Sequence, residues 1–431
     1  MEKKIKKIKI FGDSDCYGLT DKLSFTIRLT VEMRDEVDGA CLREAVNIVE
    51  QRFSYLKVSL KKDIKEFYYT ENPLPWVVLH TDKAVPLNCK ESNYQLLAFS
   101  WYGNTIYINC YHGQMDGGGV YNVMQSLLLY YCRARYDSAL TVPGTFLLED
   151  EVDPEEYRDA YLDFYNKYRS CAHKSHTVPL PRQRHVYPLK LQQTSHITSE
   201  RRSNLKLAIP QDVLMQYCSS YDGSPVTALA AMLAEAIYRV HPDTKKDIVV
   251  GMPVNLRPAM GLKKSHCNTY RKIYFTYDER IRCKDFETIG TIFRGIVIRE
   301  SDHDVLKSEI YSYCKMLKIL NLIPFTAIKQ LAARFEAKSM MNAETADITY
   351  VGKCDYGEMN QYIQSIYPDV DGYGIGIIVI LSALDNKFFL SIDQDWDDMR
   401  YINSFLSVLS ERGVTFKITS EADFNISLLS F

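Results

Sequence analysis

One histidine and one carboxylate stand at a spacing suited to acid–base chemistry, in the stretch Tyr111-His112-Gly113-Gln114-Met115-Asp116-Gly117-Gly118-Gly119-Val120. An imidazole with its ordinary pKa of about 6.5 can take a proton from an alcohol or an amine near neutral pH and return it. Asp116 then has two interpretations: it orients the imidazole directly, or it pairs with an arginine elsewhere and holds the turn rigid. Spacing alone does not choose between them.

The elements on either side of this stretch indicate how it is positioned. Thr105 to Cys110 alternates in the manner of a half-buried strand. Downstream, apolar residues recur at helical spacing, namely Val120, Val123, Met124, Leu127, Leu128 and Tyr131. His112 should therefore leave a strand, and Gly117 to Gly119 should begin a helix whose free N–H groups favour negative charge. A lone histidine is more often structural than catalytic, so the rest of the chain has to decide.

A second segment strengthens the interpretation of the His112 stretch as a catalytic site. Gly251-Met252-Pro253-Val254-Asn255-Leu256-Arg257-Pro258 follows the apolar run Ile248 to Val250, which predicts a buried strand with Arg257 at its end. With the His-x-x-x-Asp-Gly stretch, this segment resembles the superfamily of chloramphenicol acetyltransferase, nonribosomal peptide condensation domains, alcohol acetyltransferases and plant His-x-x-x-Asp acyltransferases. The resemblance spans nearly the whole chain.

Further segments follow in the order that the superfamily has. They are the opening strand Ser24 to Thr30, the first helix Asp38 to Arg52, a strand from Asn204 to Ile209, a helix from about Gln211, the apolar helix Pro225 to Val240, His266-Cys267-Asn268 where relatives often carry Gly-Asn, and Thr349-Tyr350-Val351-Gly352 where many carry Ser-Asn-x-Gly. The order is more specific than any single motif.

The resemblance implies a fold and a division of the chain. We expect an α/β sandwich of two chloramphenicol acetyltransferase-like lobes that form a pseudo-dimer. Residues 1–180 would form the N-terminal lobe, which carries the histidine motif and a crossover, and residues 181–431 the C-terminal lobe, with the boundary inside Thr141 to Arg202. In such proteins a tunnel between the lobes leads donor and acceptor to the histidine from opposite ends.

The resemblance also implies an activity: transfer of an acyl group from a thioester to a hydroxyl or amine acceptor. His112 would be the general base, Asp116 would pair with Arg257, and Gly117 would let substrate or backbone approach. Thr349 and Asn268 are candidates for oxyanion or acceptor contacts. No tightly bound cofactor is expected, and the co-substrate would be acyl-CoA or a phosphopantetheinyl thioester, with a carrier protein as a conceivable partner.

The chain departs from the superfamily at several positions. Tyr111 stands where condensation domains have a first histidine, and Thr349 and Tyr350 replace Ser-Asn. The plant signature Asp-Phe-Gly-Trp-Gly is absent, so the plant branch does not fit. Two alternatives stay open: a stand-alone condensation enzyme whose donor sits on a carrier protein, and a non-catalytic ligand-binding relative of the same fold.

Composition fits an enzyme of this kind. The chain has 431 residues, 46% hydrophobic and 25% charged, with a net charge of -2, which argues against general nucleic-acid binding. Eleven cysteines without a Cys-x-x-Cys pair indicate reduced thiols and predict a cytoplasmic location. No secretory signal follows the basic start, and the longest apolar run, Ile375 to Leu381, is too short to span a bilayer.

Charge is segregated in the crossover, where a helix from Glu155 to Arg169 is expected. Acidic residues lead (Glu149, Asp150, Glu151, Asp153, Glu155 and Glu156) and basic residues follow (Arg182, Arg184, Lys190, Arg201 and Arg202). We expect either two solvated faces of a connector or a basic part that meets the phosphates of coenzyme A or of a carrier-bound pantetheine.

Other chemistry has weaker support. Phe11-Gly12-Asp13-Ser14 has the string of Gly-Asp-Ser hydrolases, but no late Asp-x-x-His activates the serine, so a turn is expected. His173 and His176, with Cys171 nearby, lack a second ligand pair for a metal. The sequence contains no phosphate-binding glycine loop, so nothing in it indicates a nucleotide cofactor.

Overall fold

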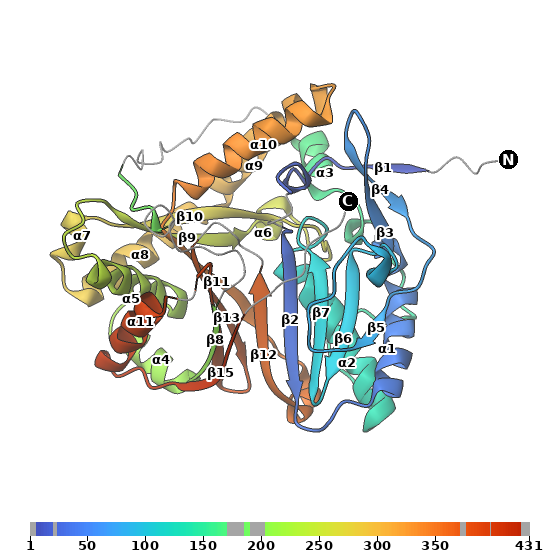
Figure 1. Cartoon of the computed structure of the whole chain (residues 1–431), viewed down its shortest axis with the longest axis horizontal. Coiled ribbons are helices and arrows are strands. Elements are labelled where there is room, and N and C mark those ends of the chain that lie inside the picture. Colours follow the sequence, from blue (N-terminus) through green and yellow to red (C-terminus); the bar gives the residue numbers. More distant parts are fainter. Residues whose placement is uncertain are drawn as a thin grey trace.

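A computed structural model describes residues 6–19, 24–169, 185–189, 203–370, 376–396 and 398–423, without the side chains of 336–341 and 421–423. Figure 1 shows two lobes side by side, each built on a sheet with helices packed against it. Several residues considered above lie outside the described residues: Cys171, His173, His176, Arg182, Arg184, Lys190, Arg201 and Arg202.

The first lobe contains a five-stranded sheet in the order β12-β2-β7-β6-β5. Its strands are β2 (Thr26–Met33), β5 (Val78–His80), β6 (Leu97–Tyr102), β7 (Thr105–Tyr111) and β12 (Ile363–Val370). The helices α1 (Gly39–Arg52) and α2 (Gly117–Arg135) share one apolar core with this sheet. A small second sheet, in the order β1-β4-β3, is made of β1 (Lys7–Lys9), β3 (Val58–Lys62) and β4 (Phe67–Glu71).

Local sequence explains why the helices of this lobe begin where they do. The Asp38 side chain accepts hydrogen bonds from the N–H groups of Ala40 (2.8 Å) and Cys41 (3.1 Å) and so caps α1. The side chains that α1 buries recur at helical spacing: Leu42, Ala45, Val46 and Val49. The short three-residue helix η1 (Asp15–Tyr17) lies just before β2 in the chain.

The second lobe contains a seven-stranded sheet in the order β10-β9-β11-β13-β14-β8-β15. Its strands are β8 (Ser203–Pro210), β9 (Ile248–Asn255), β10 (Tyr270–Tyr277), β11 (Ala346–Lys353), β13 (Ile377–Leu384), β14 (Lys387–Gln394) and β15 (Lys417–Asp423). The helices are α4 (Gln211–Ser219), α5 (Pro225–Val240), α6 (Arg257–Met260), α7 (Glu279–Arg282), α8 (Phe286–Glu300), α9 (His303–Leu322), α10 (Thr326–Met341) and α11 (Arg400–Glu411).

The two large sheets are linked by a strand from late in the chain. β12 pairs antiparallel with β2 in the first sheet, with Ile366 opposite Val31, and it also contacts β13 of the second sheet. The chain therefore returns once to the first lobe after most of the second lobe is complete. The boundary between the lobes at residue 180 remains a proposal. In that proposal the first lobe also has to include β12 from late in the chain.

The crossover differs from the expected helix of Glu155 to Arg169. Two separate elements form instead, a short helix η4 (Pro154–Glu156) and α3 (Ala160–Tyr168). The break is caused by capping: the Asp153 side chain caps η4, and the Asp159 side chain accepts from the N–H of Leu162 (3.0 Å) and starts α3. The prediction of one continuous helix was wrong.

Most other predicted elements are confirmed. The strand expected from Thr105 is β7, the helix expected from Asp38 to Arg52 is α1, and the apolar helix Pro225–Val240 is α5. Among the described residues, no helix combines the length and the apolar character needed to cross a membrane.

Candidate active site

Asp116 and Arg257 form an ion pair where the first turn of α2 meets the second lobe. The Nη1 and Nη2 groups of Arg257 donate to Asp116 Oδ2 and Oδ1, each at 2.7 Å, in a bidentate arrangement. Each side chain is 11% exposed. The same carboxylate accepts from the N–H groups of Gly119 (3.1 Å) and Thr269 (3.1 Å). Asp116 therefore caps α2 and links it to the loop before β10, and this geometry favours the second of its two interpretations.

The remaining donors of Arg257 fasten that loop. Its Nε donates to the carbonyl oxygen of Ser265 (2.7 Å), and its Nη2 also donates to that of Cys267 (2.8 Å). Gly119 lets the loop approach, because a Cβ at this position would lie 2.4 Å from the carbonyl oxygen of His266. A side chain at position 119 would push the two lobes apart here.

His112 lies directly after β7 and faces the second lobe. Its N–H donates to the carbonyl oxygen of Phe25 (2.6 Å), and its ring lies 5.8 Å from the ring of Tyr270, the first residue of β10. The side chain is half-buried. Its Nδ1 is buried and makes no hydrogen bond of ordinary geometry within the described part of the chain.

Burial lowers the pKa of His112 below its usual value, although the backbone of His112 itself and the carboxylates of Asp116 and Asp13 oppose this shift. The neutral imidazole is therefore the main form at neutral pH. A neutral ring with some accessible surface, at the junction of two lobes, can accept a proton from a bound ligand.

The end of β11 lies against the start of α2. A Cβ at Gly117 would be 3.4 Å from Val351 Cγ1, so Val351 touches the first helical residue. Thr349 lies two residues before Val351 on β11 and pairs with Ile380 of β13, just before the register of these two strands shifts between Tyr350 and Lys353. Asn268 lies in the loop before β10, and its Nδ2 donates to Asp15 Oδ2 at 3.5 Å. The predicted site residues thus come from neighbouring segments.

Asp13 is a further carboxyl group beside the histidine turn. A Cβ at Gly113, the residue after His112, would lie 2.4 Å from Asp13 Oδ2. That oxygen accepts from the hydroxyl groups of Tyr69 (2.9 Å) and Tyr111 (3.0 Å). Burial, followed by the negative charge of Asp15, raises the pKa of Asp13 to about 7. The expected turn is present, since Asp13 Oδ1 accepts from the N–H of Cys16 (3.3 Å).

A buried cluster of charges continues from Tyr270 along β10. Lys272 Nζ donates to Glu344 Oε1 (2.7 Å) and to Asp347 Oδ2 (2.6 Å). Burial, followed by the charge of Asp347, raises the pKa of Glu344 to about 8. The carboxyl groups of Glu344 and Asp347 therefore share one ammonium group, and Glu344 is protonated at neutral pH. Polar side chains thus continue from Tyr270, beside His112, along β10 and β11.

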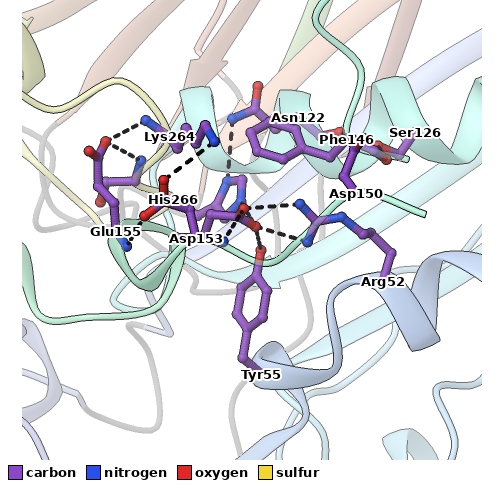
Figure 2. Close-up of polar contacts among 12 residues, drawn as sticks. Arg52, Tyr55, Asn122, Ser126, Phe146, Asp150, Asp153, Glu155, Lys264 and His266 are labelled. Carbon is purple, nitrogen blue, oxygen red and sulfur yellow. Dashed lines mark hydrogen bonds and ion pairs between the residues drawn. The ribbon is translucent and has the colours of Figure 1, made fainter. Parts of the chain in front are cut away.

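A second layer of polar contacts includes Arg52, Tyr55 and His266 (Figure 2). Glu156 accepts from Arg52 Nη1 (2.9 Å) and Nη2 (3.0 Å) and from the hydroxyl of Tyr55 (2.7 Å). The side chains of Arg52 and Glu156 are each 1% exposed. Burial alone would raise the pKa of Glu156, but the nearby imidazole of His266 and the hydrogen bonds from Arg52 and Tyr55 outweigh burial and hold this pKa well below its usual range.

This second layer holds the loop that carries the carbonyl partners of Arg257. His266 Nε2 lies 3.8 Å from Glu156 Oε2, and its Nδ1 lies 3.3 Å from Asn122 Nδ2 on α2. Glu155 Oε1 accepts from the N–H groups of Lys263, Lys264 and Ser265. The crossover is thus attached to both lobes. The expectation of a solvated acidic face holds for Glu149, Asp150 and Glu151, which are exposed. Asp153 and Glu155 are half-exposed, and the expectation was wrong for Glu156, which is buried.

Comparison with known proteins bears on this arrangement. No protein-family model matches the chain, and no curated protein matches its sequence. The first condensation domain of the calcium-dependent antibiotic synthetase is 12% identical, with a TM-score of 0.61 over 94% of this chain and 96% of that chain. The TRI101 protein of F. graminearum, complexed with coenzyme A and T-2 mycotoxin, is 11% identical, with a TM-score of 0.60 over 96% of this chain and 100% of that chain.

The epimerization domain from the third module of tyrocidine synthetase B is similar to the same degree, with 10% identity and a TM-score of 0.59 over 95% of both chains. At such identities the likeness establishes the fold. The protein has the fold shared by condensation domains and chloramphenicol acetyltransferase-like proteins, as the sequence predicted.

The structure brings together most of the residues that the sequence singled out. Asp116 and Arg257 are in direct contact, Gly117 touches β11 beside Thr349, and Asn268 lies next to Asp15. Their roles remain predictions. The sequence interpretation missed Arg52, Tyr55 and His266, together with the tyrosines around Asp13. The Asp-Pro-Glu-Glu signal of a capping box at residues 153–156 was available and would have revealed the break in the crossover.

Proposed function

We propose that the protein is an acyltransferase that moves an acyl group from a thioester to a hydroxyl or amine acceptor, with His112 as general base. The observation that carries this proposal is the position of His112. The histidine lies at the junction of the lobes, half-buried, one turn before a helix start that is fixed by a buried bidentate ion pair. The fold is one in which solved relatives bind coenzyme A.

The proposed reaction needs no covalent acyl-enzyme. The acceptor oxygen or nitrogen attacks the thioester carbonyl carbon while the imidazole of His112 takes its proton. The tetrahedral intermediate then collapses, the carbon–sulfur bond breaks, and the protonated His112 returns the proton to the departing thiolate. Because Nδ1 is buried, Nε2 is the ring nitrogen that we assign to both transfers.

The transition state carries negative charge on the carbonyl oxygen. We assign its stabilisation to the Thr349 hydroxyl, two residues before Val351 on β11, and to backbone N–H groups at the start of α2. The ion pair has a different role. The charge of Asp116 is matched by Arg257, so Asp116 holds the turn of His112 in place and is not a second base.

The donor is either free acyl-CoA or an acyl group on a carrier-bound phosphopantetheine. Coenzyme A is present in the solved TRI101 complexes, while other neighbours are condensation domains. Both groups share the same thioester and the same pantetheine arm. The donor preference therefore has to come from contacts outside the histidine site.

The experiment that tests the proposal is intact-mass screening of acceptor pools with a set of acyl-CoA and acyl-carrier donors. Appearance of an acylated acceptor with equimolar release of thiol supports the proposal, and the better donor class assigns the enzyme to the coenzyme A or to the carrier type. Saturable binding of donor or acceptor, with thiol release no faster than in a blank and unaffected by His112→Ala, would instead assign the chain to non-catalytic ligand-binding proteins of this fold.

A further inference from the structure

Seven large apolar side chains are exposed on one part of the surface. They are Ile64, Ile319, Leu322, Phe325, Ile328, Leu331 and Phe335, and their exposed fractions run from 49% to 75%. We call these seven residues the apolar tip. Six of them lie between the last turn of α9 and the third turn of α10. Ile64 lies in the turn between β3 and β4.

The segments that carry the apolar tip are in contact although they lie far apart in the sequence. The N–H of Thr326 donates to the carbonyl oxygen of Ile64 (3.0 Å), and its hydroxyl donates to that of Asp63 (2.8 Å). Figure 1 shows α9 and α10 at the edge of the molecule, with the β3–β4 turn beside them. Two projecting elements therefore present apolar residues together.

The orientation of α10 is the reverse of that usual for a surface helix. Ile328, Leu331 and Phe335, spaced three and four residues apart, share the face turned to solvent. The opposite face packs inward, where Lys329 is 1% exposed and its Nζ lies 3.3 Å from the hydroxyl of Tyr17. A large apolar helix face toward water is unfavourable and marks an interaction surface.

Basic residues surround the apolar tip. From Lys315 to Phe335 the chain has four basic residues and no acidic one, although it contains 54 acidic residues in 431. The exposed basic side chains are Lys61, Lys62 and Lys65 near Ile64, and Lys315, Lys318 and Arg334 on the two helices. Two half-exposed acidic residues, Asp63 and Glu66, flank Ile64, so the six exposed basic side chains give the surroundings of the apolar tip an excess of positive charge in a protein whose net charge is -2.

We propose that the apolar tip docks on an anionic lipid bilayer. Aliphatic and phenylalanine side chains on projecting turns insert into the boundary between headgroups and acyl chains, and surrounding lysines bind anionic headgroups. The association is peripheral. It fits this surface better than an acidic protein would, because the apolar side chains project from two separate elements, and exposed basic side chains around them outnumber the half-exposed Asp63 and Glu66 beside Ile64.

The docking surface lies close to the candidate active site. α10 packs on η1, the short helix that follows Asp13, and Asp13 lies beside the histidine turn. A membrane held at the apolar tip would therefore present lipid-like substrates on the same side of the molecule as η1. The docking itself does not depend on the proposed acyl transfer and can be tested without a substrate.

The test is co-sedimentation of the full chain with vesicles of phosphatidylcholine alone and of an equal mixture of phosphatidylcholine and phosphatidylglycerol. We expect binding to the anionic vesicles that weakens as salt is added. The double change Leu322→Ser with Phe335→Ser should weaken the partition at least about tenfold. Changing Lys65, Lys315 and Lys318 to Gln should weaken it about fivefold for each lysine.

The matched control is Ile298→Ser with Ile418→Ser, two exposed apolar side chains on α8 and β15 that are not part of the apolar tip. This control should bind vesicles as the native chain does. All variants change exposed residues, and equal thermal unfolding midpoints will show that each is folded. No binding to anionic vesicles, or equal binding by all variants, would overturn the proposal. A dimer that forms at the same protein concentration, and that is abolished only by the Leu322 and Phe335 changes, would also overturn the proposal.

Discussion

The ion pair between Asp116 and Arg257 makes the sharpest prediction about what holds the candidate site together. We consider Asp116→Ala, Arg257→Ala and the double variant. Each single change leaves the other charge 11% exposed and without its counter-charge. Arg257 would keep only its bonds to the carbonyl oxygens of Ser265 and Cys267, which cannot neutralise it.

The magnitudes follow from burial and from the hydrogen bonds that are lost. Removing one partner of a buried ion pair destabilises by about 3–5 kcal/mol. Asp116→Ala also removes the cap of α2, which adds about 1 kcal/mol. The double variant leaves no uncompensated charge. The double variant should therefore lose about 2–3 kcal/mol less free energy of unfolding than the sum of the losses in the two single variants.

The assay is urea unfolding, with the free energy of unfolding extrapolated to water for the native chain and the three variants. The pair Lys6 and Glu71 is the matched control, because its atoms are 4.0 Å apart and its side chains are 81% and 72% exposed. Changes in that pair should cost at most about 1 kcal/mol and add. Losses for Asp116 and Arg257 that add within about 0.5 kcal/mol would refute the reasoning.

Three further predictions concern the surroundings of His112. Burial raises the pKa of Asp13 to about 7, so its protonation stabilises the folded state below about pH 4, and this contribution disappears as the pH rises through 7. The thermal unfolding midpoint of the native chain should therefore fall more steeply over that pH range than the midpoint of Asp13→Asn. Parallel curves for the two proteins would contradict the raised pKa. Glu156→Gln should lower the free energy of unfolding by about 3 kcal/mol because Arg52 stays buried without its counter-charge, whereas the same change at exposed Glu151 should have no measurable effect. Thr349→Val should lower kcat about 10²-fold with little change in KM if its hydroxyl stabilises the oxyanion, and an unchanged kcat would assign that task to the backbone.

Local periodicity was enough to predict many of the elements. β7 and α5 have apolar patterns that repeat within a few residues, so neighbouring side chains alone specify them. Asp116 and Arg257 could be joined only through the resemblance to a known superfamily, because a separation of this size along the chain carries no spacing signal. The broken crossover helix was visible in its capping residues and was overlooked.

Other features have no local signal at all. β12 pairs with β2 across most of the sequence, and an apolar strand does not indicate which partner it will choose. Arg52, Glu156 and His266 each resemble an ordinary surface residue when read alone. Their burial follows only when three distant segments meet, and then each charge needs the others to offset its loss of water.

The central claim is that His112 is the base in an acyl transfer, and one comparison of rates tests it directly. With a donor and acceptor found by the screen, kcat/KM is measured against pH for the native chain, for His112→Ala and for the control His80→Ala, which changes an exposed histidine on β5. The native rate should fall as the pH drops through the pKa of His112, which burial holds below its usual value, since only the neutral ring accepts a proton. His112→Ala should lose at least about 10²-fold and this pH dependence, while His80→Ala keeps both. A His112→Ala variant that is folded and retains the native rate and pH profile would contradict the account.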